Sequence, residues 1–292
     1  MNRTIERIIH NPPSHWVGSG FRVKQYFPAE LGQAFLERFS PFILLDYQDP
    51  YFFSATPFET GVGPHPHRGF ETVTFAFAGK IEHRDHVGNR GVIGPGGLQW
   101  MTAGAGMLHK EYHETEFSKK DRILHLVQLW VDLPQKHKWT QPAYQAISAK
   151  EMGRFRPFEG GYEVVIYAGS AFGVKGPAKT FSPMNIYKIL MEKDEEVVLR
   201  EPEDHNLGLL VLSGALSMGG KELEHADFVL FSNDGDEVRL RATLEHSEVF
   251  VLSGKPLHQP IYKQGPFVMS TEEEVLEAQR DYESGGFGSD VF

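Results

Sequence analysis

Two pairs of potential metal ligands lie within one stretch of the chain. The first pair is His65 and His67, and the second is His109 and Glu111. Side chains two residues apart on a β-strand point to the same face, so each pair can present two ligands to one side of a sheet. If a β-barrel brings the two strands together, the four side chains can converge on one ion. The spacing therefore predicts a metal site.

The identity of the fourth ligand stays open on spacing alone. Glu71 follows His67 by four residues, and simple alternation along the chain predicts that it shares the face of His65 and His67. Glu111 is the other candidate, because it follows His109 by two residues. Imidazole and carboxylate ligands suit a divalent transition metal such as Fe, Mn, Ni, Cu or Zn. Four protein ligands would leave one or two coordination positions for water, substrate or dioxygen.

Composition excludes several other kinds of site. The 292 residues carry a formal net charge of −10, whereas non-specific nucleic-acid binding needs basic patches, so we expect no direct binding to nucleic acid. The chain has no cysteine, which leaves His, Asp and Glu as metal ligands. No run of about 18 apolar residues could span a bilayer, and Met1–Ile9 has no signal-peptide pattern. We therefore expect a cytoplasmic protein without a membrane partner.

The elements around the ligand pairs read as short strands with Gly and Pro turns. Phe70–Ala78 alternates between apolar and polar or small residues, Gly79-Lys80 forms a turn, and Ile81–Asp85 returns. Further strands are predicted at Leu98–Ala103, Met107–Tyr112 and Leu124–Val131. This pattern favours an all-β sandwich or barrel. Other histidines of this half are expected to be structural or surface residues: His83, His86, His113 and His125.

The second half of the chain repeats the pattern of short strands and glycine turns, but without the two ligand pairs. Pro134–Tyr144 is polar and contains two prolines, which predicts a linker over residues 135–144 between domains at 1–134 and 145–292. Leu207–Gly214 mirrors Thr72–Gly79 and ends in the same glycine turn, a weak internal repeat. The second domain is predicted to bind no metal, because its histidines are isolated: His205, His225, His246 and His258.

One good helix is predicted, near the C-terminal end of the chain. Ser270–Tyr282 begins with hydroxyl residues that can cap a helix, and acidic residues fill its first turn, where they suit the helix dipole. Gly285-Gly286 then ends the helix. We therefore expect a short C-terminal helix on an otherwise all-β protein.

Several motifs together resemble one known family. His65–Val73 reads His-Pro-His-Arg-Gly-Phe-Glu-Thr-Val, Leu98–Gly104 reads Leu-Gln-Trp-Met-Thr-Ala-Gly, and His109 is followed by Glu111. These runs resemble the pirin family of the cupin superfamily, although Gly104 stands where the second cupin motif usually has proline. Gln264–Met269 is similar to the C-terminal run of pirins. The resemblance covers nearly the whole chain.

The resemblance implies a fold and a ligand set. Pirins have two cupin β-barrels that pack face to face, with a metal in the N-terminal barrel only. They hold iron through three histidines and a glutamate, and the matching positions in this chain are His65, His67, His109 and Glu111. The resemblance therefore favours Glu111 over Glu71 as fourth ligand and Fe(II) as the metal, while other divalent ions (Mn, Ni, Cu, Zn) remain compatible.

The resemblance also implies two alternative functions. Some pirins have quercetin 2,3-dioxygenase activity, and here Glu111 would be both a ligand and the general base that accepts the proton of the flavonol 3-hydroxyl group. The substrates would be a flavonol and O2. The alternative is a non-enzymatic, iron-containing redox sensor with a protein partner, either a transcription factor or a metabolic enzyme. Ligand residues alone suit both functions.

Overall fold

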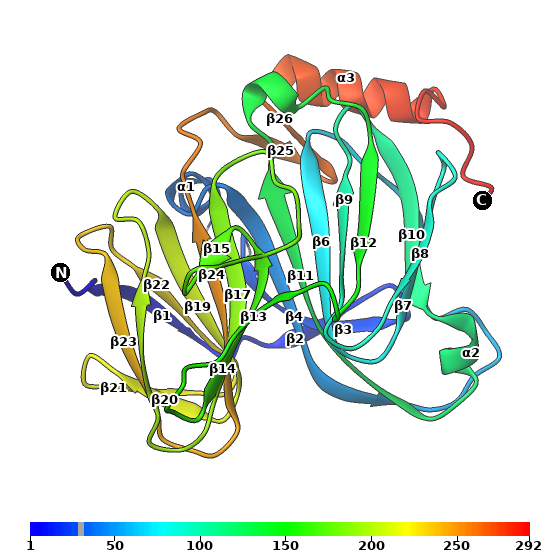
Figure 1. The fold of residues 1–292 in the computed structure, drawn as a ribbon. Coiled ribbons are helices and arrows are strands. Elements are labelled where there is room, and N and C mark those ends of the chain that lie inside the picture. Colours follow the sequence, from blue (N-terminus) through cyan, green and yellow to red (C-terminus); the bar gives the residue numbers. More distant parts are fainter. Residues whose placement is uncertain (29–31) are drawn as a thin grey trace. The chain divides into compact units, whose positions relative to one another are not determined.

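The computed structural model describes residues 1–28 and 32–292 as a mainly β protein with two compact units (Figure 1). The histidine unit comprises residues 13–37, 41–150 and 257–292, and the second unit comprises residues 1–12, 38–40 and 151–256. The predicted all-β class is confirmed. None of the helices in the described residues has the length and apolar character that a membrane crossing requires.

The histidine unit contains a large and a small antiparallel sheet. The large sheet has the strand order β12-β9-β6-β11-β4-β3-β2, and the small sheet has the order β5-β10-β7-β8. A separate hairpin is formed by β25 and β26. The strands are β2 (Ser14–Val17), β3 (Phe21–Phe27), β4 (Phe42–Phe53), β5 (Gly61–His67), β6 (Phe70–Ala78), β7 (Ile81–Asp85), β8 (Arg90–Ile93), β9 (Leu98–Thr102), β10 (Met107–His113), β11 (Arg122–Asp132), β12 (Ala143–Ile147), β25 (Tyr262–Gln264) and β26 (Phe267–Met269).

The second unit repeats this pair of sheets. Its large sheet has the order β1-β22-β19-β24-β17-β14-β13, its small sheet the order β18-β23-β20-β21, and β15 pairs with β16. Aliphatic side chains such as Leu209, Val229 and Val251 are fully buried between its strands. The strands are β1 (Ile5–His10), β13 (Gly153–Phe155), β14 (Tyr162–Ala168), β15 (Ser170–Ala171), β16 (Val174–Lys175), β17 (Met184–Met191), β18 (Glu196–Arg200), β19 (Asn206–Ser213), β20 (Ala215–Met218), β21 (Lys221–Glu224), β22 (Asp227–Phe231), β23 (Glu237–Ala242) and β24 (Ser247–Gly254).

The bounds of the two units differ from the predicted domains 1–134 and 145–292. Strand β1, near the start of the chain, pairs antiparallel with β22 of the second unit. Residues 257–292, near the end of the chain, belong to the histidine unit. Each unit thus includes a segment from near the opposite end of the chain. This arrangement depends on contacts between segments far apart in the sequence, which local patterns of hydrophobicity and turn residues do not reveal.

The predicted linker at 135–144 is part of the histidine unit. It begins with a short 3-10 helix, Gln135–His137, and it runs into β12, which pairs with β9 at the edge of the large sheet. Between them Lys138 is almost fully buried, at 1% relative exposure. A polar, proline-containing stretch resembled a linker because the sequence does not show that Lys138 has buried partners.

In the part of the chain that the structure describes, three α-helices accompany the strands. The predicted C-terminal helix is confirmed as α3 (Glu272–Glu283), with the Thr271 side chain accepting a hydrogen bond from the Glu274 backbone N–H at 3.2 Å. Val275 and Ala278 are its buried residues. Two short helices, α1 (Gly32–Arg38) and α2 (Thr115–Ser118), were not predicted, because segments of this length carry no helical periodicity to detect.

Arg68 ties α3 to the strand that carries the first histidine pair. Its guanidinium donates to Asp281 on α3 at 2.8 Å and to the Ala105 carbonyl oxygen at 2.6 Å. The same group lies over the rings of Trp139 and Phe287, with centroid distances of 5.0 and 4.5 Å. Arg68 is therefore a buried anchor for the C-terminal segment, directly beside His67.

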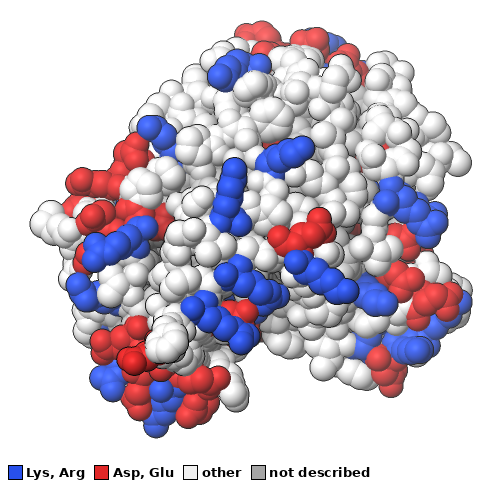
Figure 2. Space-filling model, viewed as in Figure 1, with Lys and Arg blue, Asp and Glu red and all other residues white. Residues whose placement is uncertain are grey.

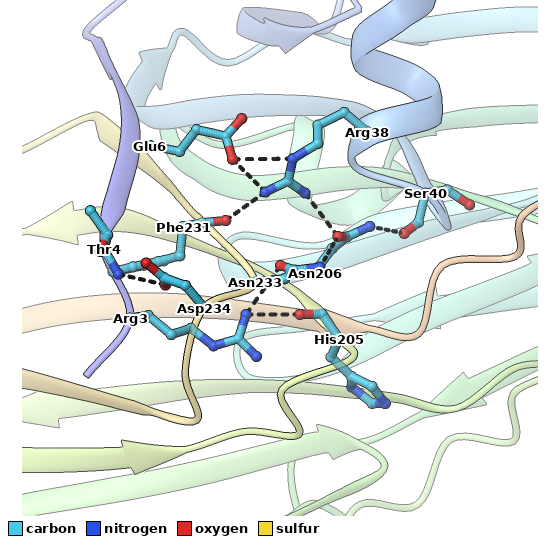
Figure 3. Close-up of polar contacts among 10 residues, drawn as sticks. All are labelled: Arg3, Thr4, Glu6, Arg38, Ser40, His205, Asn206, Phe231, Asn233 and Asp234. Carbon is cyan, nitrogen blue, oxygen red and sulfur yellow. Dashed lines mark hydrogen bonds and ion pairs between the residues drawn. The ribbon is translucent and has the colours of Figure 1, made fainter. Parts of the chain in front are cut away.

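Hydrogen bonds from two arginines fix the separate segments of the second unit (Figure 3). Arg38 donates to Glu6 at 2.5 Å, to the Phe231 carbonyl at 2.7 Å and to Asn206 at 2.8 Å. Arg3 donates to the His205 carbonyl at 2.8 Å. The residues at 1–12 and 38–40 are thereby attached to the strands of residues 151–256.

On the face shown in Figure 2, many acidic and basic residues lie next to one another. An example is Glu163, which pairs with Arg154 at 2.6 Å and Arg156 at 2.7 Å. Exposed pairs of this kind contribute little to stability. They do place opposite charges side by side.

Candidate metal centre

Strands β5 and β10 bring three of the predicted ligands together. The strands are antiparallel neighbours, with His109 opposite His65 and Met107 opposite His67. The three imidazole rings have centroid separations of 4.3 to 4.9 Å, and one nitrogen from each lies within 4.8 Å of the other two. The spacing argument thus leads to a real cluster of His65, His67 and His109.

The environment keeps these three histidines neutral. Burial lowers the pKa of His65, against the opposing effects of its hydrogen bond to Gly63 and the nearby charge of Glu111. Burial, together with the neighbouring histidines, lowers the pKa values of His67 and His109 well below the usual histidine range. A neutral imidazole has one nitrogen with a free lone pair, which is the form that binds metals.

Unused nitrogen atoms show that the cluster fits a metal ion. Among the described residues, His67 Nδ1 and His109 Nε2 are buried without any hydrogen-bond partner. His65 Nδ1 donates to the Gly63 carbonyl oxygen at 2.8 Å, so its Nε2 is the atom left with a lone pair. Buried polar atoms without partners are costly, and coordination to a divalent ion would satisfy all three rings.

Glu111 lies next to this cluster and is held by three donors. Its Oε1 accepts hydrogen bonds from Thr74 Oγ1 at 3.0 Å and from the Gln99 amide, and its Oε2 accepts from the Gln128 amide at 2.9 Å. Its charge raises the pKa of His65, opposing the effect of burial, so the carboxylate is close to that ring. The group of mutually close ligand atoms contains the histidines only. Glu111 as fourth ligand therefore stays a prediction.

Glu71 points away from Glu111, contrary to the face predicted for it. β5 ends at His67 and β6 begins at Phe70 in the other sheet, and the turn between them contains Gly69 at φ +87°. Alternation therefore does not continue from His67 to Glu71. Thr74 contacts Glu111, so the even-numbered residues of β6 face the site. Glu71 instead accepts from Thr102 Oγ1 at 2.7 Å, and burial raises its pKa to about 7.

Replacing Glu71 by glutamine is expected to change how stability depends on pH. The folded pKa of about 7 exceeds the ordinary value of 4.5, so ionisation of Glu71 costs the parent stability as pH rises through that window. Glu71→Gln removes this cost and should gain about 3 kcal/mol relative to the parent between pH 4 and pH 8. Urea unfolding of the metal-free protein at several pH values measures the difference.

The control for this experiment is Glu116→Gln, because the Glu116 side chain is 74% exposed. Its effect on the free energy of unfolding should be small at every pH. If Glu71→Gln differed from the parent by the same amount at pH 4 and pH 8, the elevated pKa of Glu71 would be wrong. The four tryptophans of the chain all lie in the histidine unit, so their fluorescence reports its unfolding.

Several residues of the site were not predicted from the sequence. Gln99 and Gln128 hold Glu111, and each is a glutamine with an apolar residue on both sides in its strand, a signal that could have found them. Trp130 is half-buried beside His67, with ring centroids 5.2 Å apart. His83 was expected to be structural or exposed, and it is fully buried in contact with His109.

The remaining histidines of this unit have other partners. His86 Nδ1 accepts from the Leu108 backbone N–H at 3.0 Å. His113 Nε2 donates to the Gly20 carbonyl oxygen at 2.8 Å, and His125 lies 3.1 Å from the Tyr47 hydroxyl. These contacts are of the structural kind, and none of these three residues joins the cluster of ligand atoms.

Two family profiles match the chain, one in each half. The profile described as Pirin matches residues 20–131, and the one described as Pirin C-terminal cupin domain matches residues 186–288. A Pseudomonas aeruginosa protein, whose name gives quercetin 2,3-dioxygenase as a provisional activity, is 40% identical over 281 residues, or 96% of each chain. A pirin-like protein of Caulobacter vibrioides is 33% identical over 288 residues, covering 98% of this chain and 99% of that one.

A solved structure agrees along the full length. The crystal structure of quercetin 2,3-dioxygenase from Acinetobacter baumannii has a TM-score of 0.94 and 42% sequence identity to this chain, and the match covers 100% of both chains. The similarity therefore includes both units and the terminal segments that they exchange.

Proposed function

The chain belongs to the pirin family, and on that basis we propose that it is a metal-dependent dioxygenase that cleaves flavonols with O2. The observation that carries the proposal is the cluster of three neutral histidines with unpartnered nitrogens beside a firmly held carboxylate. Relatives named for quercetin 2,3-dioxygenase support the choice of reaction. The proposed substrates are a flavonol and O2. The proposed function involves neither nucleic acid nor a membrane.

The proposed metal is Fe(II), held by His65, His67, His109 and Glu111. The donor set is equally compatible with Mn, Ni, Cu or Zn. When bound, the ion would act as a Lewis acid toward the flavonol 3-hydroxyl group and would allow reaction with dioxygen. The second unit is proposed to serve without a metal of its own.

Glu111 is the proposed general base. An ionised carboxylate can accept the proton that the 3-hydroxyl group must lose before the ring is attacked. Thr74, Gln99 and Gln128 all donate to this carboxylate, so its two oxygens stay in fixed positions while the proton moves. Ring cleavage then proceeds with loss of carbon monoxide.

Trp130 supplies an aromatic surface for a planar substrate. Its half-buried ring lies 5.2 Å from the His67 ring and 4.4 Å from the Phe70 ring, measured between centroids. The ammonium group of Lys263 lies 5.6 Å from the centre of the same ring. A flavonol that contacts Trp130 would also lie near this positive charge, which favours an ionised substrate.

Metal removal tests the function directly. The protein is purified without oxygen, loaded with Fe(II) and mixed with quercetin in air-saturated buffer, and the loss of flavonol absorbance is followed. We expect turnover with about one metal per chain, loss of turnover after treatment with a chelator, and recovery when Fe(II) is returned. Metal-bound protein that consumes none of several flavonols would contradict the proposal and favour a redox sensor with a protein partner.

A further inference from the structure

A fourth histidine lies directly behind one of the proposed ligands. His83 Nδ1 is 3.3 Å from His109 Nδ1, and the His83 ring is fully buried. Its other nitrogen, Nε2, is 3.1 Å from Asp85 Oδ2. The ring also stacks on Tyr144, with a centroid distance of 4.3 Å and an interplanar angle of 12°. Contacts on both nitrogens and on one face therefore fix the orientation of His83.

Asp85 determines which nitrogen of His83 carries the proton. Asp85 Oδ1 accepts hydrogen bonds from the backbone N–H groups of Val87 at 3.2 Å and Asn89 at 2.9 Å. Its Oδ2 accepts from the Asn89 side-chain amide at 2.8 Å. A carboxylate that accepts from all its other partners also accepts from His83, so His83 Nε2 carries a hydrogen. In the neutral ring, Nδ1 is then a bare acceptor.

The proton position on His83 decides that on His109. Two bare nitrogens cannot hydrogen-bond to each other, so the short contact between the Nδ1 atoms requires a hydrogen on His109 Nδ1. Neutral His109 then has its lone pair on Nε2. This is the atom that is buried without a partner and belongs to the ring clustered with His65 and His67.

We propose that His83 and Asp85 are positioning residues that hold His109 in the tautomer required for metal binding. The chain of donors runs from His109 Nδ1–H to His83 Nδ1, and from His83 Nε2–H to Asp85 Oδ2. This inference rests on the proposed metal site but not on the proposed reaction. His83 itself is not a ligand, because both of its nitrogens are already engaged.

The substitution Asp85→Asn should reverse the direction of both hydrogen bonds, the one between Asp85 and His83 and the one between His83 and His109. The two backbone N–H groups keep the amide oxygen in the Oδ1 position, so the amide nitrogen takes the place of Oδ2. There it donates to His83 Nε2, and the Asn89 amide, which donates to Oδ2 in the parent, rotates to present its oxygen instead. The hydrogen of His83 then moves to Nδ1 and donates to His109 Nδ1. His109 is left with its hydrogen on Nε2, where it blocks coordination.

Two measurements test this reversal. Affinity for Co(II), measured by competition with a chelator, should fall 10- to 100-fold in Asp85→Asn, the usual cost of losing such a partner of a ligand. Nitrogen-15 NMR of the metal-free protein should show His109 with its hydrogen on Nδ1 in the parent and on Nε2 in the variant. Neither measurement uses a flavonol, so a protein without dioxygenase activity would still give both results.

The matched control is Asp227→Asn in the second unit. Asp227 is also buried and lies 2.9 Å from a histidine nitrogen, that of His10. The Co(II) affinity of the Asp227→Asn variant should equal that of the parent. His83→Phe, which keeps the ring but removes the acceptor, should leave His109 as a mixture of tautomers and should also weaken binding. Parent-like affinity together with an unchanged tautomer in Asp85→Asn would overturn the proposal.

Discussion

Glu111→Gln is expected to lower kcat for quercetin by about 10²- to 10⁴-fold, the contribution typical of a general base, while most of the metal stays bound. The amide cannot accept the substrate proton, but the three histidines that make up the cluster are unchanged. The amide oxygen can still accept from Thr74 and Gln99, and rotation of the Gln128 amide presents an oxygen to the new NH2 group. Metal analysis and the flavonol absorbance assay on the same sample separate the two effects.

The control for this substitution is Glu71→Gln. Glu71 is another buried glutamate of the same unit, but it bonds to Thr102 and points away from Glu111. Turnover by the Glu71→Gln variant should match that of the parent. Turnover that is unchanged in Glu111→Gln would show that Glu111 is not the base. Loss of both metal and turnover would show that Glu111 is mainly a ligand.

Lys138→Met is expected to destabilise the histidine unit by about 3–5 kcal/mol, because it leaves an uncompensated buried charge. Lys138 Nζ donates to Asp132 at 2.6 Å, to the Gly69 carbonyl at 3.0 Å and to the Val268 carbonyl at 2.8 Å. Both members of the ion pair are at most 1% exposed. Burial already raises the pKa of Asp132 in spite of the lysine, so loss of the ammonium would remove its main stabilising partner.

Urea unfolding followed by tryptophan fluorescence measures this effect, since every tryptophan lies in the histidine unit. Lys136→Met is the control, because Lys136 is exposed, and its effect should stay within about 0.5 kcal/mol. The double variant Lys138→Met with Asp132→Asn should be more stable than Lys138→Met alone, because it removes the unpaired charge. A loss below about 1 kcal/mol in Lys138→Met would contradict the role of this pair.

Local patterns in the sequence were sufficient for the fold class and for the histidines. Alternating strands with Gly and Pro turns led to the all-β architecture, and a capping residue followed by acidic residues led to α3. The spacing of His65, His67 and His109 was informative because β5 and β10 are each continuous through their ligands. The resemblance to the pirin family is confirmed over both halves of the chain.

The errors come from interactions between distant segments and from one turn. Glu71 was placed on the wrong face because a change of sheet at Gly69 interrupts the period-2 pattern. Lys138 was read as part of a linker because its partners lie 69 and 130 residues away, apart from Asp132. His83 could not be linked to His109 without the pairing of β7 with β10.

The exchange of terminal segments has a consequence for biosynthesis. The hairpin of β25 and β26 and helix α3 belong to the histidine unit, yet they follow the whole of residues 151–256 along the chain. A ribosome therefore synthesises the second unit before it releases the residues that complete the first. Val268 and Asp281, which bond to Lys138 and Arg68, emerge only after residues 151–256. A nascent chain that stops before residue 257 would therefore lack the contacts that Asp281 makes with Arg68, beside His67.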